Sequence, residues 1–218
     1  EFVASKSLFM SSYSLFTTIF KKYGINVKLV DPLNLDDIEQ SINEKTRFVY
    51  VETITNPGME IADIKSISQI AHSNGIPLLI DNTLASPWLC RPIELGADIV
   101  LHSTTKYLSG HGGALGGVVV DAGNFNWANE KFSDFAPFVE QKGNLAFLHR
   151  LFKEHHINFG TTPAPLHSYL TAIGLNTLGL RMERHMENAI KVAAFLKEQP
   201  KVEWVNFPGF KDHNCHEI

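Results

Sequence analysis

Short apolar runs alternate with helix-like segments along the first half of the chain. Runs of β-branched and aromatic residues between polar turns predict strands, and five such runs follow one another: FVAS, NVKLV, RFVYVE, IPLLID and ADIVLHS. Two of the intervening segments, residues 11–25 and 63–75, are predicted to be helices that end at Gly24 and Gly75, because glycine suits a helix C-cap. A third segment, residues 35–43, has acidic residues in its opening turns, where the helix dipole favours them.

The order of these elements predicts an α/β fold with a mainly parallel sheet, because strands that alternate with helices are joined by crossovers. The runs PLLI and DIVL are apolar at every position. This is typical of strands that are covered by helices on both faces. A further strand is predicted in GALGGVVVDAG, where glycines frame a valine run. We therefore expect three layers with the sheet in the middle.

The pattern changes in the second half. Residues 124–163 are irregular and rich in aromatic side chains, and helical periodicity returns from Leu166 to about Gln199. The segment VEWVNFP then alternates as a strand does. These observations predict a first domain at residues 1–163. At residues 164–218 they predict a long connecting helix and the first strand of a second domain.

Composition is typical of a globular protein and argues against some classes of partner. The 218 residues are 44% hydrophobic and 19% charged, which provides enough apolar material for a substantial core. A net charge of −4 gives no electrostatic reason to expect nucleic-acid binding, and the apolar runs are too short to span a membrane. The two cysteines, Cys90 and Cys215, lie far apart in the sequence. We therefore expect no disulfide framework and a cytoplasmic location.

Reactive side chains stand at the ends of three predicted strands. Open α/β sheets bind ligands outside the carboxyl ends of their strands, where such side chains would meet. The candidates are, in chain order, Glu52 and Asn56, then Asp81 and Thr83, then Ser103, Thr105 and Lys106.

A lysine, a carboxylate and two hydroxyls at neighbouring strand ends match the needs of pyridoxal phosphate. A lysine amine can form a Schiff base with the aldehyde, and a carboxylate can pair with the protonated pyridine nitrogen. Hydroxyls and backbone amides can bind the phosphate. Spacing alone leaves plainer alternatives open. Lys106 could be a solvated lysine, Asp81 a turn residue, and Ser103 and Thr105 partners of backbone groups in a tight turn.

Three longer segments resemble the Cys/Met-metabolism family of fold-type-I pyridoxal phosphate enzymes: VETITNPGMEIADI, LLIDNTLASPWLCRPIELGADIVLHSTTKYLSGHG and LGLRMERHMENAIKVAAFL. The resemblance covers nearly the whole chain, and the ETxxNP, DNT and STTKYxxGH elements in this order are together highly specific. It implies the large domain of that fold, with a mainly parallel sheet of the seven-stranded type. It also implies that the chain includes the start of a smaller C-terminal domain.

The resemblance implies a role for each candidate residue. Lys106 would bind the cofactor aldehyde and act in catalysis, and Asp81 would pair with the pyridine nitrogen. The other cofactor contacts would come from Ser103 and Thr105 at the phosphate, Asn56 near the phenolic oxygen, and Thr83 and Phe9 against the ring. Where the family usually has a stacking tyrosine, this chain has Phe9, which keeps the ring and loses the hydroxyl.

Two features of the family have no counterpart within residues 1–218: a glycine-containing phosphate loop, and an arginine that holds the substrate carboxylate. We therefore expect the chain to correspond to the middle of such an enzyme, with the loop before Glu1 and the arginine beyond Ile218. Family members form dimers that pair into tetramers with shared active sites. The complete protein is thus expected to be a homo-oligomer that acts on small molecules.

The segments VVVDAGNFNW and KFSDFAPFVE resemble the O-acetylhomoserine sulfhydrylase branch of the family. That branch replaces the γ-acetoxy group of O-acetyl-L-homoserine with sulfide or a thiol, giving homocysteine or methionine and acetate in methionine biosynthesis. Cystathionine or methionine γ-lyase and cystathionine γ-synthase activities remain as alternatives. A further alternative is that the chain, taken by itself, is folded but catalytically silent.

Overall fold

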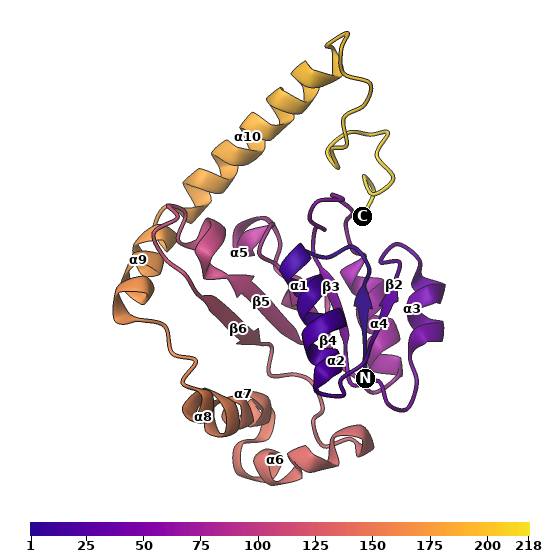
Figure 1. Cartoon of the computed structure of the whole chain (residues 1–218), viewed down its shortest axis with the longest axis vertical. Helices are drawn as coiled ribbons and strands as arrows, with labels where there is room; N and C mark the ends of the chain where they lie inside the picture. Colours follow the sequence, from indigo (N-terminus) through magenta and orange to yellow (C-terminus); the bar gives the residue numbers. More distant parts are fainter.

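The computed structural model describes residues 1–218 and is built around a six-stranded sheet (Figure 1). The strands are β1 (Phe2–Ser5), β2 (Val27–Val30), β3 (Val49–Glu52), β4 (Leu78–Asp81), β5 (Ile99–Ser103) and β6 (Gly117–Asp121), in the spatial order β2-β1-β3-β4-β5-β6. The first five strands run parallel, and β6 pairs antiparallel with β5. The predicted α/β class and mainly parallel sheet are confirmed. The sheet has six strands, where the family resemblance implied seven.

Helices cover both faces of the parallel strands. On one face lie α1 (Met10–Ser14) and α2 (Phe20–Lys22), joined by a π-helical turn. On the other lie α3 (Leu35–Ser41) and α4 (Ile64–Ser73). Side chains alternate across β1, so Phe2 packs with Phe16 on the α1–α2 side, while Val3 joins the larger core that includes Ile67 of α4. This arrangement produces the three expected layers.

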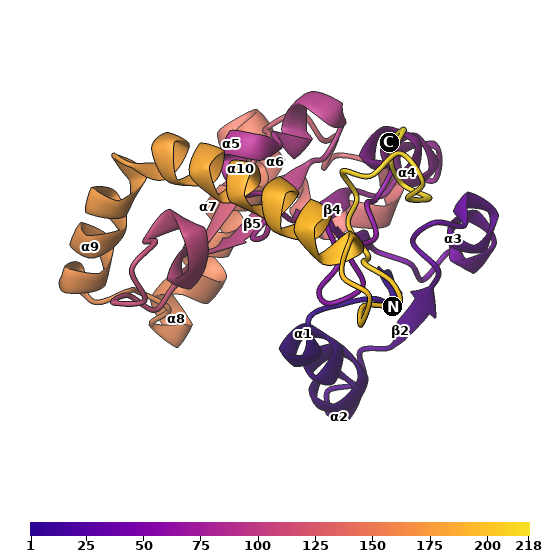
Figure 2. The same cartoon turned by 90° about the horizontal axis from the view of Figure 1, so that it is seen from above.

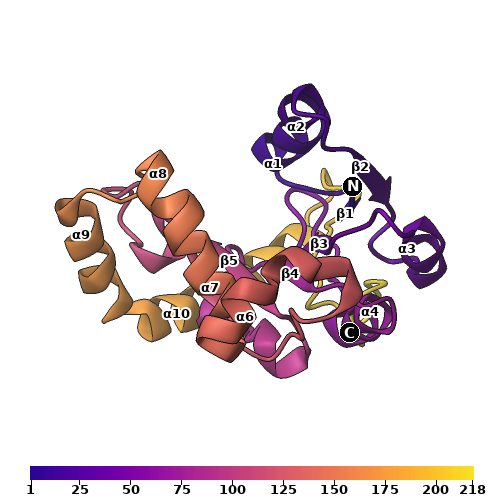
Figure 3. The same cartoon turned by 90° about the horizontal axis from the view of Figure 1, so that it is seen from below.

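The aromatic segment after β6 belongs to the core. Trp127 stacks on Phe135 and Phe147, with ring centroids 4.5 Å and 5.2 Å away. The helices of this region are α6 (Ala136–Lys142), α7 (Ala146–Arg150) and α8 (Ile157–Phe159), whereas the short helix α5 (Ser86–Leu89) lies earlier, between β4 and β5. In the view of Figure 1, α6, α7 and α8 lie below the sheet, and Figure 3 shows them from that side. The unusual aromatic content therefore serves packing.

The predicted long helix forms as two helices, α9 (Pro165–Leu175) and α10 (Leu178–Lys197). Figure 2 shows α10 running across the top of the molecule toward the C-terminal segment. No helix in the structure has both the length and the hydropathy that a membrane crossing requires.

The strand predicted for VEWVNFP is wrong. Residues 202–206 pair with no strand, and Trp204 is exposed. An alternating pattern forms a strand only where another strand accepts its hydrogen bonds. The segment instead folds back over the loop after β3, where Asn206 Nδ2 donates to Gly58 O (2.7 Å) and Ile61 N donates to Cys215 Sγ (3.5 Å). The division of the chain into domains at residue 163 stays a prediction.

Candidate active site

A cavity of ≈ 240 Å³ lies at the carboxyl ends of β3, β4 and β5. Nine residues line it: Phe9, Glu52, Ile54, Asn56, Asp81, Thr83, Leu84, Ser103 and Lys106. Six of the seven predicted site residues are in this set. The sheet brings them together, because the register of β3 on β4 sets Glu52 directly beside Asp81.

The seventh predicted residue, Thr105, does not line the cavity. Its hydroxyl accepts a hydrogen bond from Gly116 N (3.2 Å) and lies 3.4 Å from Gly116 O. Thr104 N also donates to Gly116 O (2.9 Å). In this structure Thr105 therefore fastens the turn after β5 to the segment before β6, as the tight-turn alternative expected.

Lys106 lies in the turn Thr104–Leu108, directly after β5. Its backbone leaves helical geometry (φ −92°, ψ −123°), which kinks the turn at the lysine. The residue is exposed, its Nζ lies 6.0 Å from the centroid of the Phe9 ring, and it takes part in none of the ion pairs of the chain. The amine is thus accessible and free of a carboxylate partner inside the chain.

Arg181 of α10 binds the turn Thr104–Leu108, here called the lysine turn, from outside the sheet. Its guanidinium donates from Nη1 to Tyr107 O (2.9 Å) and from Nη2 to Gly174 O (2.7 Å). Its Nε donates to Thr177 Oγ1 (3.1 Å). One side chain therefore joins the residue after Lys106 to the end of α9 and the start of α10.

Close packing reinforces this connection. Gly174 allows α9 to approach the turn, because a Cβ at this position would collide with the carbonyl oxygens of Leu108 and Ser109. Leu108 is buried in a small cluster with Leu178 and Met182. The segment LGLRMER, which served the sequence analysis only as a family marker, thus helps to determine where Lys106 lies.

Glu52 fixes the backbone on two sides of the cavity. Its Oε1 accepts from Phe9 N (2.7 Å) and its Oε2 accepts from Asn56 N (3.1 Å). Burial raises the pKa of the Glu52 carboxyl, the charge of Asp81 raises it further, and the two backbone hydrogen bonds oppose the rise. Glu52 therefore serves as a buried support that sets the positions of Phe9 and Asn56.

Asp81 takes part in a turn and also lines the cavity. Its Oδ1 accepts from Thr83 N (2.9 Å), and Thr83 Oγ1 in turn accepts from Ser103 N (2.8 Å). Its Oδ2 accepts from the Tyr50 hydroxyl at 3.3 Å. The turn interpretation and the ligand interpretation of Asp81 are therefore compatible.

Two supporting residues besides Arg181 were not among the predicted site residues. Asn82 is fully buried, accepts from Thr53 Oγ1 (2.8 Å) and donates from Nδ2 to Cys90 O (2.8 Å). Tyr50 shares a strand face with Glu52, two residues on. Two features of the sequence could have indicated them. Asn82 directly follows Asp81 at the end of a strand, and Tyr50 precedes Glu52 by two residues, which places both side chains on the same face of β3.

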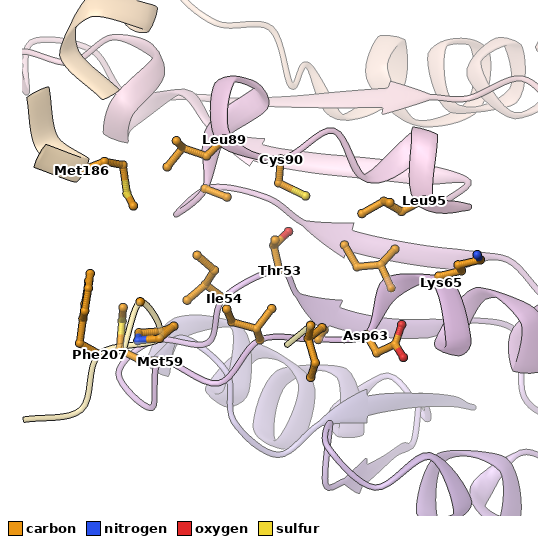
Figure 4. Close-up of a pocket in the computed structure, with 17 residues that line it drawn as sticks. Thr53, Ile54, Met59, Asp63, Lys65, Leu89, Cys90, Leu95, Met186 and Phe207 are labelled. Atoms are coloured by element: carbon orange, nitrogen blue, oxygen red, sulfur yellow. The ribbon is translucent and has the colours of Figure 1, made fainter. Parts of the chain in front are cut away.

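A second, larger cavity of ≈ 610 Å³ has a different character (Figure 4). Its walls are mainly apolar, including Leu89, Met186 and Phe207, and Figure 4 shows these side chains arranged around an open space. The carboxylate on its rim, Asp63, already caps α4 by accepting from Ser66 N (3.1 Å). This cavity gathers none of the reactive groups that surround Lys106.

Comparisons with known proteins identify the family. The family model described as Cys/Met metabolism PLP-dependent enzyme matches residues 1–218. An O-acetyl-L-homoserine sulfhydrylase from Leptospira meyeri is 42% identical over 226 residues, which cover 96% of this chain and 51% of the relative. An L-methionine gamma-lyase from Fusobacterium nucleatum subsp. polymorphum is 37% identical over 217 residues, covering 99% of this chain and 50% of that protein.

Comparison of the fold with solved structures leads to the same family. A solved structure of an O-acetylhomoserine sulfhydrylase from Wolinella succinogenes matches with a TM-score of 0.90 at 35% identity, covering 99% of this chain and 62% of that chain. The chain spans about half the length of the curated relatives it matches. Because the family model matches it from end to end, the chain belongs to the Cys/Met metabolism family of PLP-dependent enzymes.

Proposed function

We propose that the cavity binds pyridoxal phosphate. We further propose that the complete protein uses it to replace the γ-acetoxy group of O-acetyl-L-homoserine with sulfide or a thiol. The products are homocysteine or methionine, and acetate. The observation that carries the proposal is the convergence of Lys106, Asp81 and Phe9 on one cavity at the strand ends. The choice of reaction is supported by the likeness to the Leptospira and Wolinella sulfhydrylases.

The groups around the cavity suit this cofactor. Besides the accessible amine of Lys106, the Ser103 side chain lines the cavity while its backbone N–H is occupied by Thr83 Oγ1. Asp81 supplies a carboxylate beside them. When bound, pyridoxal phosphate supplies an aldehyde that an amine can capture and a ring that draws electron density from the α carbon of an amino acid.

Each residue that lines the cavity then has a role that its position supports. Lys106 Nζ would hold the aldehyde carbon and, when neutral, accept the proton of the substrate α carbon. Asp81 would accept a hydrogen bond from the ring nitrogen. The remaining contacts would be a ring face covered by Phe9, a second ring contact from Thr83, the phenolic oxygen bound by Asn56, and the phosphate bound by Ser103 and Thr105. Thr105 would have to exchange its bond to Gly116 for this.

The cofactor part is tested with the chain as it stands. Excess pyridoxal phosphate followed by borohydride should fix one adduct, and peptide mapping should locate it on Lys106. Lys106→Gln should abolish the adduct, and Lys65→Gln, at an exposed lysine of α4, should leave it unchanged. No adduct, or labelling spread over surface lysines, would show that residues 1–218 do not hold the cofactor by themselves.

The reaction part is tested with the complete protein. O-acetyl-L-homoserine with sulfide should give homocysteine and acetate at a steady-state rate that exceeds the release of 2-oxo acid from methionine. A second candidate, γ-elimination, is supported by the gamma-lyase relative at 37% identity. Rapid formation of ammonia and 2-oxo acid from methionine, without replacement activity, would select this second candidate.

A further inference from the structure

A tyrosine that does not line the cavity contacts the carboxylate at its centre. Tyr50 of β3 is 5% exposed, and its ring packs edge-on against Phe16 with centroids 5.0 Å apart. In the β3–β4 register, Tyr50 lies opposite Leu79. Its side chain therefore reaches diagonally along β4, and the hydroxyl donates to Asp81 Oδ2 at 3.3 Å.

The environment keeps this phenol in its donor form. Burial raises the pKa of Tyr50 well above its usual range, and the charges of Asp81 and Glu52 raise it further. The nearby Ser12 side chain opposes the rise only in part. At neutral pH the hydroxyl is therefore protonated.

Asp81 thus receives two donors from different elements. Thr83 N approaches Oδ1 from the turn after β4, and the Tyr50 hydroxyl approaches Oδ2 from β3. A carboxylate held at both oxygens loses the freedom to rotate about its last bond. It is therefore oriented before any ligand arrives.

We propose that Tyr50 is a positioning residue for Asp81, which orients the carboxylate toward the ring nitrogen of bound pyridoxal phosphate. The inference rests on the proposed cofactor site and names a member of it that touches neither cofactor nor substrate. Packing alone does not require the hydroxyl, because phenylalanine would fill the same place against Phe16. A buried phenol without a hydrogen-bond partner would be unfavourable.

The first experiment needs no cofactor. Tyr50→Phe removes only the hydroxyl, and Tyr23→Phe is the matched control because Tyr23 is 78% exposed. The chain is labelled with carbon-13 at its aspartate side chains. At pH 7 the chemical shift of the Asp81 carboxyl carbon should change in Tyr50→Phe and remain that of the wild type in Tyr23→Phe. An Asp81 resonance unchanged by Tyr50→Phe would overturn the inference.

The second experiment compares two ligands. One is pyridoxal phosphate, and the other is its analogue with carbon in place of the ring nitrogen. Tyr50→Phe should weaken binding of pyridoxal phosphate by roughly five- to tenfold, in keeping with the loss of one hydrogen bond of ordinary strength. Binding of the analogue should change less than twofold, because it offers Asp81 no ring N–H.

The outcomes separate the two proposals. Equal weakening for both ligands, or for neither, would overturn the positioning role while pyridoxal phosphate binding by the wild-type chain still supports the cofactor site. A wild-type chain that binds neither ligand would overturn the cofactor site for residues 1–218, and with it the role given to Tyr50 there. Thermal unfolding of Tyr50→Phe, measured in parallel, checks that the variant remains folded.

Discussion

Two carboxylates at opposite ends of neighbouring strands have very different surroundings. Asp98, at the amino end of β5, is 2% exposed, and its Oδ2 both accepts from Leu78 N and contacts His72 Nε2, each at 2.8 Å. Asp81, at the carboxyl end of β4, is only partly buried and lines the cavity. Burial raises the pKa of Asp98, and its hydrogen bonds to Leu78 and His72 oppose the rise.

The difference separates a structural carboxylate from one that can take a ligand. Asp98 is almost fully buried, and the partners of its Oδ2 join the start of β4 to the last turn of α4. Asp81 keeps one side toward open space, at the sheet end where α/β folds place ligands. Near-complete burial between two elements indicates that Asp98 serves stability, whereas the open side of Asp81 leaves room for a ligand.

The largest expected effect on stability is at the amino end. Asp98→Ala should lower the free energy of unfolding by about 2–3 kcal/mol, because it leaves the buried Leu78 N–H without an acceptor. Asp81→Ala should lower it by less, about 1 kcal/mol, since the turn hydrogen bond from Thr83 N is only partly buried and the bond from the Tyr50 hydroxyl is long at 3.3 Å. Urea denaturation of both variants measures the two values. Equal losses would show that Asp98 and Asp81 contribute equally to stability despite their different burial.

A smaller effect is expected where α10 holds the lysine turn. Arg181→Met should reduce the free energy of unfolding by about 1 kcal/mol through the loss of its hydrogen bonds. It should also speed hydrogen exchange at Gly110 N, which is bonded to Lys106 O.

Arg184→Met is the matched control on the same helix, because Arg184 forms only an exposed ion pair with Glu187. Its stability and its exchange rates should match those of the wild type. If the two variants behaved alike, the carboxyl end of the sheet would hold the lysine turn without help from α10.

The smallest effect is a pH dependence from His102, the next-to-last residue of β5. Burial lowers the pKa of His102 below the usual histidine value of 6.5, although the bond to Asn82 O opposes this. As pH falls below 6.5, the unfolded chain binds this proton first, so stability is lost. The slope contributed is at most about 1.4 kcal/mol per pH unit.

Denaturation of wild type and His102→Asn between pH 7.5 and pH 5 measures this contribution. As pH falls, the wild type should lose more free energy of unfolding than His102→Asn, so the stability advantage of the wild type should shrink. His155→Asn, at an exposed histidine, should follow the wild type. Parallel curves for all three proteins would contradict the assignment.

The sequence predicted best what is local and periodic. Strand runs such as RFVYVE and IPLLID, and the glycines that end helices, can be recognised from a few neighbouring residues. Because parallel strands share an edge, the candidates at their carboxyl ends could be expected to meet, and the cavity contains six of them.

Contacts between distant segments were not predictable in this way. Nothing near Arg181 in the sequence indicates that it holds Tyr107, 74 residues away. The run STTK contains three hydroxyls, but the sequence does not show which of them bonds to the backbone of the turn. In the structure the Thr105 hydroxyl accepts a hydrogen bond from Gly116 N. VEWVNFP has a strand pattern, and only the tertiary structure shows that no strand is there to receive it.

The antiparallel strand β6 has a practical consequence for handling the chain. It ends the sheet, so one row of its backbone groups has no partner strand, and Val118, Val119 and Val120 are each 37–39% exposed. An open edge with exposed valines is a template on which chains aggregate at high concentration. A single lysine in place of Val119 is the natural change for keeping concentrated samples dispersed.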